Sequence, residues 1–175
     1  MIKLLDLLKE DSPFVPRGGN ERMENFYKNK IQQYIKDGMK GDLILIGDPI
    51  TSLPDNLTTV GGDLYLQDTK ITSLPDNLTT VGGDLFLEYS KITKLPDNLT
   101  VIGKLDLSNT PITTLPDNLT VGAWLKLEGA KKIKSLPSSL RVKTWISIQN
   151  TPLSKKYSKD EIRAMIPNVE GNIRM

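Results

Sequence analysis

The sequence predicts an α/β solenoid, in which short repeats coil and their strands stack into one parallel sheet of six to seven rungs. The first observation is a Leu-Pro pair that recurs at nearly constant spacing, at Leu53, Leu74, Leu95, Leu115 and Leu136. The second is a short alternation of aliphatic and other residues ahead of each pair, which is typical of a strand with one buried face. Strands that repeat in the same direction through a long connection must pair in parallel. The regular spacing therefore indicates stacked copies of one unit.

Residues 1–40 are expected to form a helical N-terminal cap. Over residues 20–37, apolar side chains recur at spacings of three and four, which predicts an amphipathic helix able to cover the first strand. Asn20 is placed as its N-cap and Gly38 as its stop. Residues 2–9 are expected to form a shorter helix, and "DSPFVPRGGN" a loop. The apolar stripe consists of Met23, Phe26, Tyr27, Ile31, Tyr34 and Ile35.

Residues 41–153 are expected to hold the repeats. In each predicted strand the two aliphatic residues face inward and the residue between them faces outward, because successive side chains of a strand point to opposite faces. One copy cannot cover its own aliphatic residues, so neighbouring copies must bury them. The pairs Gly61 with Gly62 and Gly82 with Gly83 are expected to make tight turns into two of the strands. The predicted strands are residues 42–45, 63–66, 84–87, 104–107, 124–127 and 145–148.

Residues 154–175 are expected to form the C-terminal cap, and the three parts to fold as one domain. Ser158 and Glu161 have the spacing of a capping box, which predicts a short helix ending before Pro167. Residues 171–175, "GNIRM", repeat the pattern of the earlier strands and are expected to add a seventh. A helix followed by a strand would then close this end of the solenoid, as repeat proteins require.

The repeat unit LxLxxTxIxxLPxxLxxV resembles the leucine-rich repeat, in the Leu-Pro form of its bacterial class. The flanks "KIQQYIKDGMKGDL" and "PLSKKYSKDEIRAMIPNVEGNI" resemble the ends of short leucine-rich-repeat proteins encoded by tailed bacteriophages. This resemblance implies a phage or prokaryotic origin. One departure concerns the Asn that the family places after the strand to bond the turn backbone. Here the position holds Asp48, Thr69, Ser90, Thr110, Ala130 and Thr151, whose polar members are expected to bond some of those amides.

Composition excludes several kinds of chemistry. The chain has no Cys and no His, which removes disulfides, thiolate nucleophiles, Cys-type zinc sites and the Ser-His-Asp arrangement. Lys and Arg number 23 against 21 Asp and Glu, so neither nucleic acid nor a membrane is the expected partner. No signal peptide and no membrane-spanning run is apparent, and the expected location is the cytoplasm of a host cell or a virion. No cofactor is expected.

The outward positions of the strands form the candidate binding surface. Tyr65 and Phe86 should touch on adjacent strands, with Asp106 and Lys126 following in the same row. Because Trp and Tyr dominate binding hot spots, the aromatic residues are expected to contact a protein partner. The alternative is that they stabilise the sheet across strands or, as expected for Ile44, lie beneath the N-terminal cap. The candidate set is Tyr65, Phe86, Asp106, Lys126, Trp124 and Trp145, the last two expected to be exposed.

Two further groups of acids could form a metal site or a catalytic pair. The column Asp55, Asp76, Asp97 and Asp117 is better explained by turn capping than by a metal ion. Asp160 and Glu161 fit first-turn charges of a helix better than a catalytic pair. The sequence therefore predicts a non-enzymatic module that binds a protein partner, either as a factor that binds a host protein or as a structural component of a virion. It leaves self-association undecided.

Overall fold

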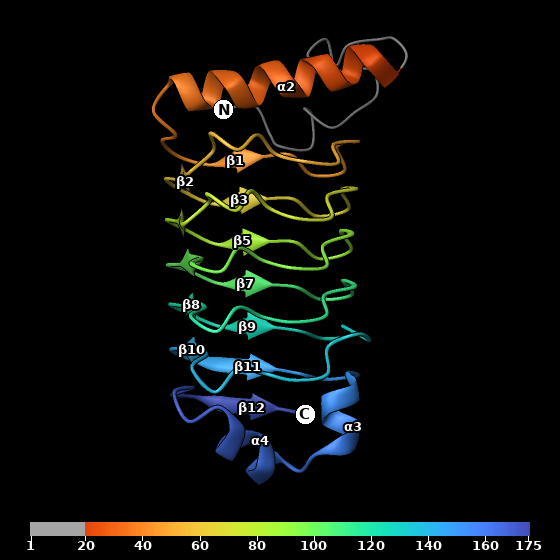
Figure 1. Cartoon of the computed structure of the whole chain (residues 1–175), viewed down its shortest axis with the longest axis vertical. Helices are drawn as coiled ribbons and strands as arrows, with labels where there is room; N and C mark the ends of the chain where they lie inside the picture. The colour runs from red at the N-terminus through yellow and green to blue at the C-terminus, as the bar shows by residue number, and fades with distance from the viewer. Residues whose placement is uncertain (1–19) are drawn as a thin grey trace, which may run out of the picture.

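The computed structural model describes residues 20–175, and they form a solenoid of stacked coils with a helix across one end (Figure 1). The expected helix over residues 2–9 and the loop after it lie outside the described residues. Helix α2 (Asn20–Lys36) begins at Asn20 itself, which was expected as its cap. Gly38 follows with φ +80°, and the Met39 amide donates to the Tyr34 carbonyl at 3.0 Å. The predicted glycine stop is therefore confirmed.

A seven-stranded parallel sheet runs the length of the stack (Figure 1). Its register pairs Tyr65 with Phe86 and Phe86 with Asp106, so the predicted row of outward residues is confirmed. We call each of these strands, with its coil, a rung. In spatial order the strands are β1 (Leu43–Ile44), β3 (Leu64–Tyr65), β5 (Leu85–Phe86), β7 (Leu105–Asp106), β9 (Leu125–Lys126), β11 (Trp145–Ser147) and β12 (Asn172–Arg174).

A second parallel sheet, which the sequence did not predict, has five strands on another side of the coil. Its strands are two residues long, as most of those in the first sheet are, but no alternation surrounds them: in the first copy the buried Leu57 and Val60 are three residues apart. Four of the five have the sequence Thr-Val, with the Val buried inside the coil. The strands are β2 (Thr59–Val60), β4 (Thr80–Val81), β6 (Thr100–Val101), β8 (Thr120–Val121) and β10 (Arg141–Val142).

The core is one continuous cluster of aliphatic side chains inside the coil. In the second rung, for example, Leu64, Leu66, Ile71 and Leu78 are fully buried. Each rung covers its neighbours, as predicted. Tyr27 and Ile31 of α2 join the cluster from above the first rung. The apolar face of α2 thus closes the end of the core.

The turn after each strand depends on a left-handed residue that the sequence analysis overlooked. The backbone there has φ between +56° and +70°. At the next position each Thr hydroxyl donates to a carbonyl three residues back, as from Thr69 to Leu66 at 2.8 Å. Of these hydroxyls only that of Thr151 also accepts from a following amide within the described residues, so the expected bond to the turn backbone is confirmed there alone. Ala130 keeps the same turn through its amide, which donates to the Leu127 carbonyl. The left-handed residues are Gly47, Asp68, Tyr89, Asn109, Gly129 and Asn150.

The C-terminal cap contains one helix more than predicted. Helix α3 (Pro152–Lys156) has Thr151 as its N-cap: the backbone amide of Ser154 donates to the Thr151 hydroxyl. Helix α4 (Lys159–Met165) carries the predicted capping box, and β12 follows as the predicted last strand. Within residues 20–175, no helix combines the length and the apolar character that a membrane span needs.

Candidate functional site

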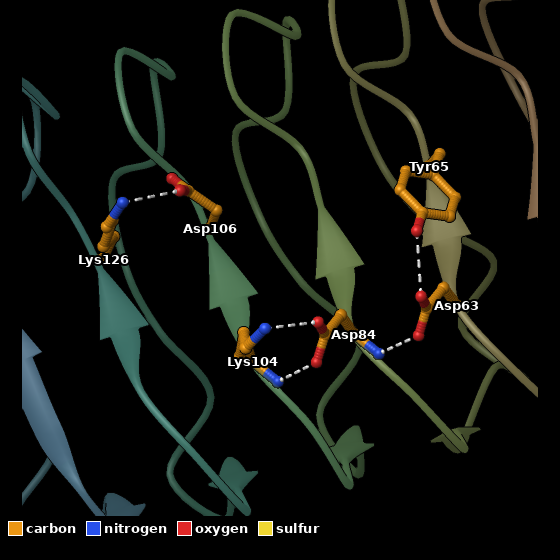
Figure 2. Close-up of polar contacts among 6 residues, drawn as sticks. All are labelled: Asp63, Tyr65, Asp84, Lys104, Asp106 and Lys126. Atoms are coloured by element: carbon orange, nitrogen blue, oxygen red, sulfur yellow. Dashed lines mark hydrogen bonds and ion pairs between the residues drawn. The ribbon is translucent and has the colours of Figure 1, made fainter. Parts of the chain in front are cut away.

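The candidate site is the outward face of the seven-stranded sheet, which we call the outward face. All six residues singled out from the sequence lie on it, from β3 to β11 or, for Trp124, directly before β9. Parallel, in-register pairing brings residues about 20 positions apart in the chain to neighbouring places, since adjacent strands lie about 4.8 Å apart. The structure therefore assembles the six into one strip. Figure 2 draws three of them, Tyr65, Asp106 and Lys126, with the neighbouring Asp63, Asp84 and Lys104.

Tyr65 and Phe86 stack on adjacent rungs, with ring centroids 5.1 Å apart and planes inclined by 22°. The Tyr65 hydroxyl donates to Oδ2 of Asp63 at 2.9 Å (Figure 2). Burial, followed by this hydrogen bond, raises the pKa of Tyr65 to about 12, so the hydroxyl remains a donor at neutral pH. Both rings are half-buried. The predicted contact is confirmed, and it leaves part of each ring accessible.

Asp106 and Lys126 continue the row, but Asp106 is less accessible than the sequence suggested. Its side chain is buried, with 7% of the residue exposed. Oδ1 accepts from the Ser108 amide at 2.9 Å, and Oδ2 lies 3.6 Å from Nζ of Lys126. Asp106 thus orients Lys126, which is the more accessible member of the pair.

Trp124 and Trp145 stack with ring centroids 5.2 Å apart and planes inclined by 17°. They are half-buried, not exposed as expected, because cations lie against both. Nζ of Lys126 is 4.7 Å from the centroid of Trp124, and the Arg174 guanidinium is 4.0 Å from that of Trp145. Such contacts stabilise rings and cations together. The pair therefore offers ring edges and flanking positive charge to a partner.

A ladder of aspartates precedes the strands at the N-terminal half of the outward face. The amide of Asp63 donates to Oδ1 of Asp42 at 2.8 Å, and the amide of Asp84 donates to Oδ1 of Asp63 at 2.7 Å. At the third step Oδ1 of Asp84 accepts from the Lys104 amide, while Oδ2 lies 3.1 Å from Nζ of Lys104 (Figure 2). These carboxylates satisfy the backbone where the coil enters each strand. In the next two rungs Trp124 and Trp145 occupy the position that these aspartates hold in the first three.

The expected turns into the strands are present, because the backbone bends at both pairs of glycines ahead of β3 and β5, but Gly62 and Gly83 are required there for a steric reason. The φ of Gly62 and Gly83 is not positive. A Cβ on Gly83 would instead lie 2.0 Å from Oδ1 of Asp63, and one on Gly62 would lie 2.2 Å from Oδ1 of Asp42. Glycine is thus required because an aspartate of the previous rung fills the space beside it.

Sequence reasoning missed several outward features. Tyr89 and Ile102 are the large apolar residues that are exposed in the described chain, each at 56%. Glu88 and Gln67 follow β5 and β3, and Oε2 of the first and Oε1 of the second are buried without a hydrogen-bond partner among the described residues. Burial, ahead of the nearby Asp106 charge, raises the pKa of Glu88. Tyr89 could have been noticed in the sequence, because the equivalent position of the other rungs holds Gly, Asp or Asn.

The two other groups of acids lie away from this face. Asp55, Asp76, Asp97 and Asp117 are exposed in their turns, and residues 20–175 contain no group of three or more acids placed to hold a metal ion. The Glu161 carboxylate accepts from the Ser158 amide at 2.8 Å, as a capping residue does. Ile44 is half-buried, and its carbonyl accepts from Lys30 of α2. It therefore lies beside the cap.

Comparison of the chain with models of known protein families gives no match. Comparison with curated proteins gives none either.

Proposed function

We propose that this protein is a non-enzymatic interaction module that binds another protein through the outward face. The single observation that supports it most is the assembly of Tyr65, Phe86, Trp124, Trp145 and Lys126 into one half-buried strip on a rigid sheet. Hot spots of protein interfaces are enriched in Tyr, Trp and Arg and tend to cluster. A face that is largely pre-assembled also loses little conformational entropy on binding.

The chemistry of the strip favours a protein over a flat ligand. Trp124 and Trp145 already stack on one another, and cations lie over both rings. A sugar or base that needs a free ring face would have to displace those contacts. A protein surface can instead pack against ring edges and pair with Lys126 or Arg174. The resemblance to leucine-rich-repeat proteins of phages supports a bacterial host protein as the partner.

Capture from a bacterial lysate with immobilised protein tests the proposal. Tyr65→Ala combined with Phe86→Ala should abolish recovery of a partner that the unchanged protein binds in a fixed ratio. The matched control is Thr80→Ala with Thr100→Ala, on the second sheet, whose hydroxyls make no hydrogen bond within residues 20–175. Equal stability of both double variants, checked by thermal unfolding, is required. Intact capture by the aromatic variant would reject the outward face as the site.

The alternative, a structural component of a virion, depends on the resemblance of the flanks alone. It predicts the protein at fixed stoichiometry in purified particles. Mass spectrometry of purified particles whose genome carries the gene distinguishes the two roles. If the protein is absent from the particles, the virion role is rejected and the host-directed module remains.

A further inference from the structure

Helix α2 covers the free edge of the first strand of the solenoid. β1 pairs only with β3 within the sheet, so the polar backbone of Ile44 faces α2. Nζ of Lys30 donates to the Ile44 carbonyl at 2.5 Å. An uncovered edge strand would invite pairing with another chain. How firmly α2 is held therefore decides whether this edge is accessible.

The first rung carries an ionisable residue where the other rungs do not. Asp48 occupies the position held elsewhere by Thr69, Ser90, Thr110, Ala130 and Thr151. It is buried, with 7% of the residue exposed, and its Oδ2 has no hydrogen-bond partner among the described residues. The other rungs show that a neutral residue satisfies the turn. A buried carboxylate is costly unless it is paired or neutralised. Its occurrence at the one rung that meets α2 points to a role in the cap.

Two residues of α2 face Asp48. Tyr27, itself buried, acts on the Asp48 carboxylate through its hydroxyl, and Lys30 acts on it through its charge. We propose that Asp48 is a pH-sensitive latch where the first rung meets α2: its protonation removes the cost of a buried charge, which Tyr27 and Lys30 offset only in part, and so holds α2 over β1 most firmly. The latch does not depend on the proposed function, because it concerns the end of the solenoid and not the outward face.

The direction of the pH dependence follows from burial. Burial raises the pKa of Asp48 from 3.8 to about 6, while the Tyr27 hydrogen bond and the Lys30 charge oppose that rise. When α2 leaves, the carboxyl returns to water and to its ordinary pKa. The docked state therefore holds the proton more tightly, and docking weakens as pH rises from about 4 to about 6. Burial also raises the pKa of Tyr27, so its hydroxyl stays protonated in this range.

Native-state hydrogen exchange of the full chain, followed residue by residue from pH 4 to pH 7.5, tests the latch. The opening constant of α2, measured at the Ile31 and Tyr34 amides, should rise by up to about 100-fold across the range, as a pKa difference near two units requires. The amides of Leu105 and Leu107, in the central rung, report global unfolding. Global unfolding also exposes Asp48 and so carries the same Asp48 dependence. These amides therefore serve to locate the opening: α2 should show a larger opening constant than the central rung at every pH, because only the cap opens.

Asp48→Asn and Asp48→Thr should make the opening constant of α2 independent of pH. Asp55→Asn, in the same coil but exposed, is the matched control and should keep the slope. Tyr27→Phe removes a hydrogen bond that favours the ionised Asp48, so the pKa of Asp48 should rise further. The pH-dependent rise in the opening constant of α2 should then continue to higher pH. The proposal is overturned if Asp48→Asn retains the slope of the unchanged protein, or if the opening constant of α2 in the unchanged protein does not rise between pH 4 and pH 6.

Discussion

Oδ1 of Asp63 accepts a hydrogen bond from the backbone amide of Asp84, 2.7 Å away on the next rung (Figure 2). Its Oδ2 accepts from the Tyr65 hydroxyl, so one carboxylate joins the backbone of the stack to the aromatic strip of the outward face. Hydrogen bonds to a charged acceptor are stronger than neutral ones. The aspartate ladder should therefore contribute to stability as well as position Tyr65.

Asp63→Ala should lower the free energy of unfolding by about 2 kcal/mol, because it leaves the Asp84 amide and the Tyr65 hydroxyl without their charged acceptor. Denaturant unfolding measures the change. Asp97→Ala is the control, since Asp97 is exposed and should change stability by less than about 0.5 kcal/mol. Equal effects of the two substitutions would show that the ladder contributes nothing.

Gly83→Ala should also destabilise the protein, by about 1 to 3 kcal/mol as overpacked sites do. The added Cβ would collide with Oδ1 of Asp63. Combined with Asp63→Ala, it should cost less than the sum of the two single changes, because the carboxylate that fills the space is gone. A double-mutant cycle measures this coupling. Strict additivity would contradict the steric link. The sequence itself supports the link: Ala123 occupies the position equivalent to Gly83, and the rung before it has Lys104 in place of the aspartate.

Tyr89→Asn should stabilise the protein by about 1 kcal/mol, the usual cost of holding an ordinary residue in the left-handed region. Tyr89 has φ +61° and is 56% exposed, so its removal sacrifices little packing. The reverse change, Asn109→Tyr at φ +56°, should destabilise by a similar amount. Thermal unfolding of both variants gives the comparison. A loss of stability in Tyr89→Asn would reveal a contribution of the ring that outweighs the strain.

Ser158→Ala should lower the free energy of unfolding by about 1 kcal/mol through loss of the N-cap of α4. The Ser158 backbone and side chain hold the pKa of Glu161 below its ordinary value. The contribution of Glu161 is therefore present above that ordinary pKa and is lost as pH falls through the lowered one. Acid titration of stability should show a loss below about pH 4.5 that Glu161→Gln removes. An identical acid loss in Glu161→Gln would assign it to other carboxylates.

The sequence by itself determined the repeat and the rows of the outward face. Regular spacing and a two-residue alternation suffice to place Tyr65, Phe86 and Asp106 on consecutive strands, because both follow from local chain geometry. The capping box of α4 and the glycine stop of α2 are equally local, and both were predicted. The second sheet was not predicted, because no two-residue alternation surrounds its Thr-Val pairs: the buried Leu57 and Val60, for example, are three residues apart.

The tertiary structure decided how accessible and how ionised the side chains are. Asp106 is buried beside Lys126 of the next rung, and Trp124 and Trp145 lie against Lys104 and Arg174 of neighbouring rungs, although the tryptophans were expected to be exposed. Burial raises the pKa of Asp48, and Tyr27 and Lys30 of α2 oppose the rise. Each effect arises between residues about 20 or more positions apart, where desolvation and charge depend on the packed neighbours and not on the local pattern.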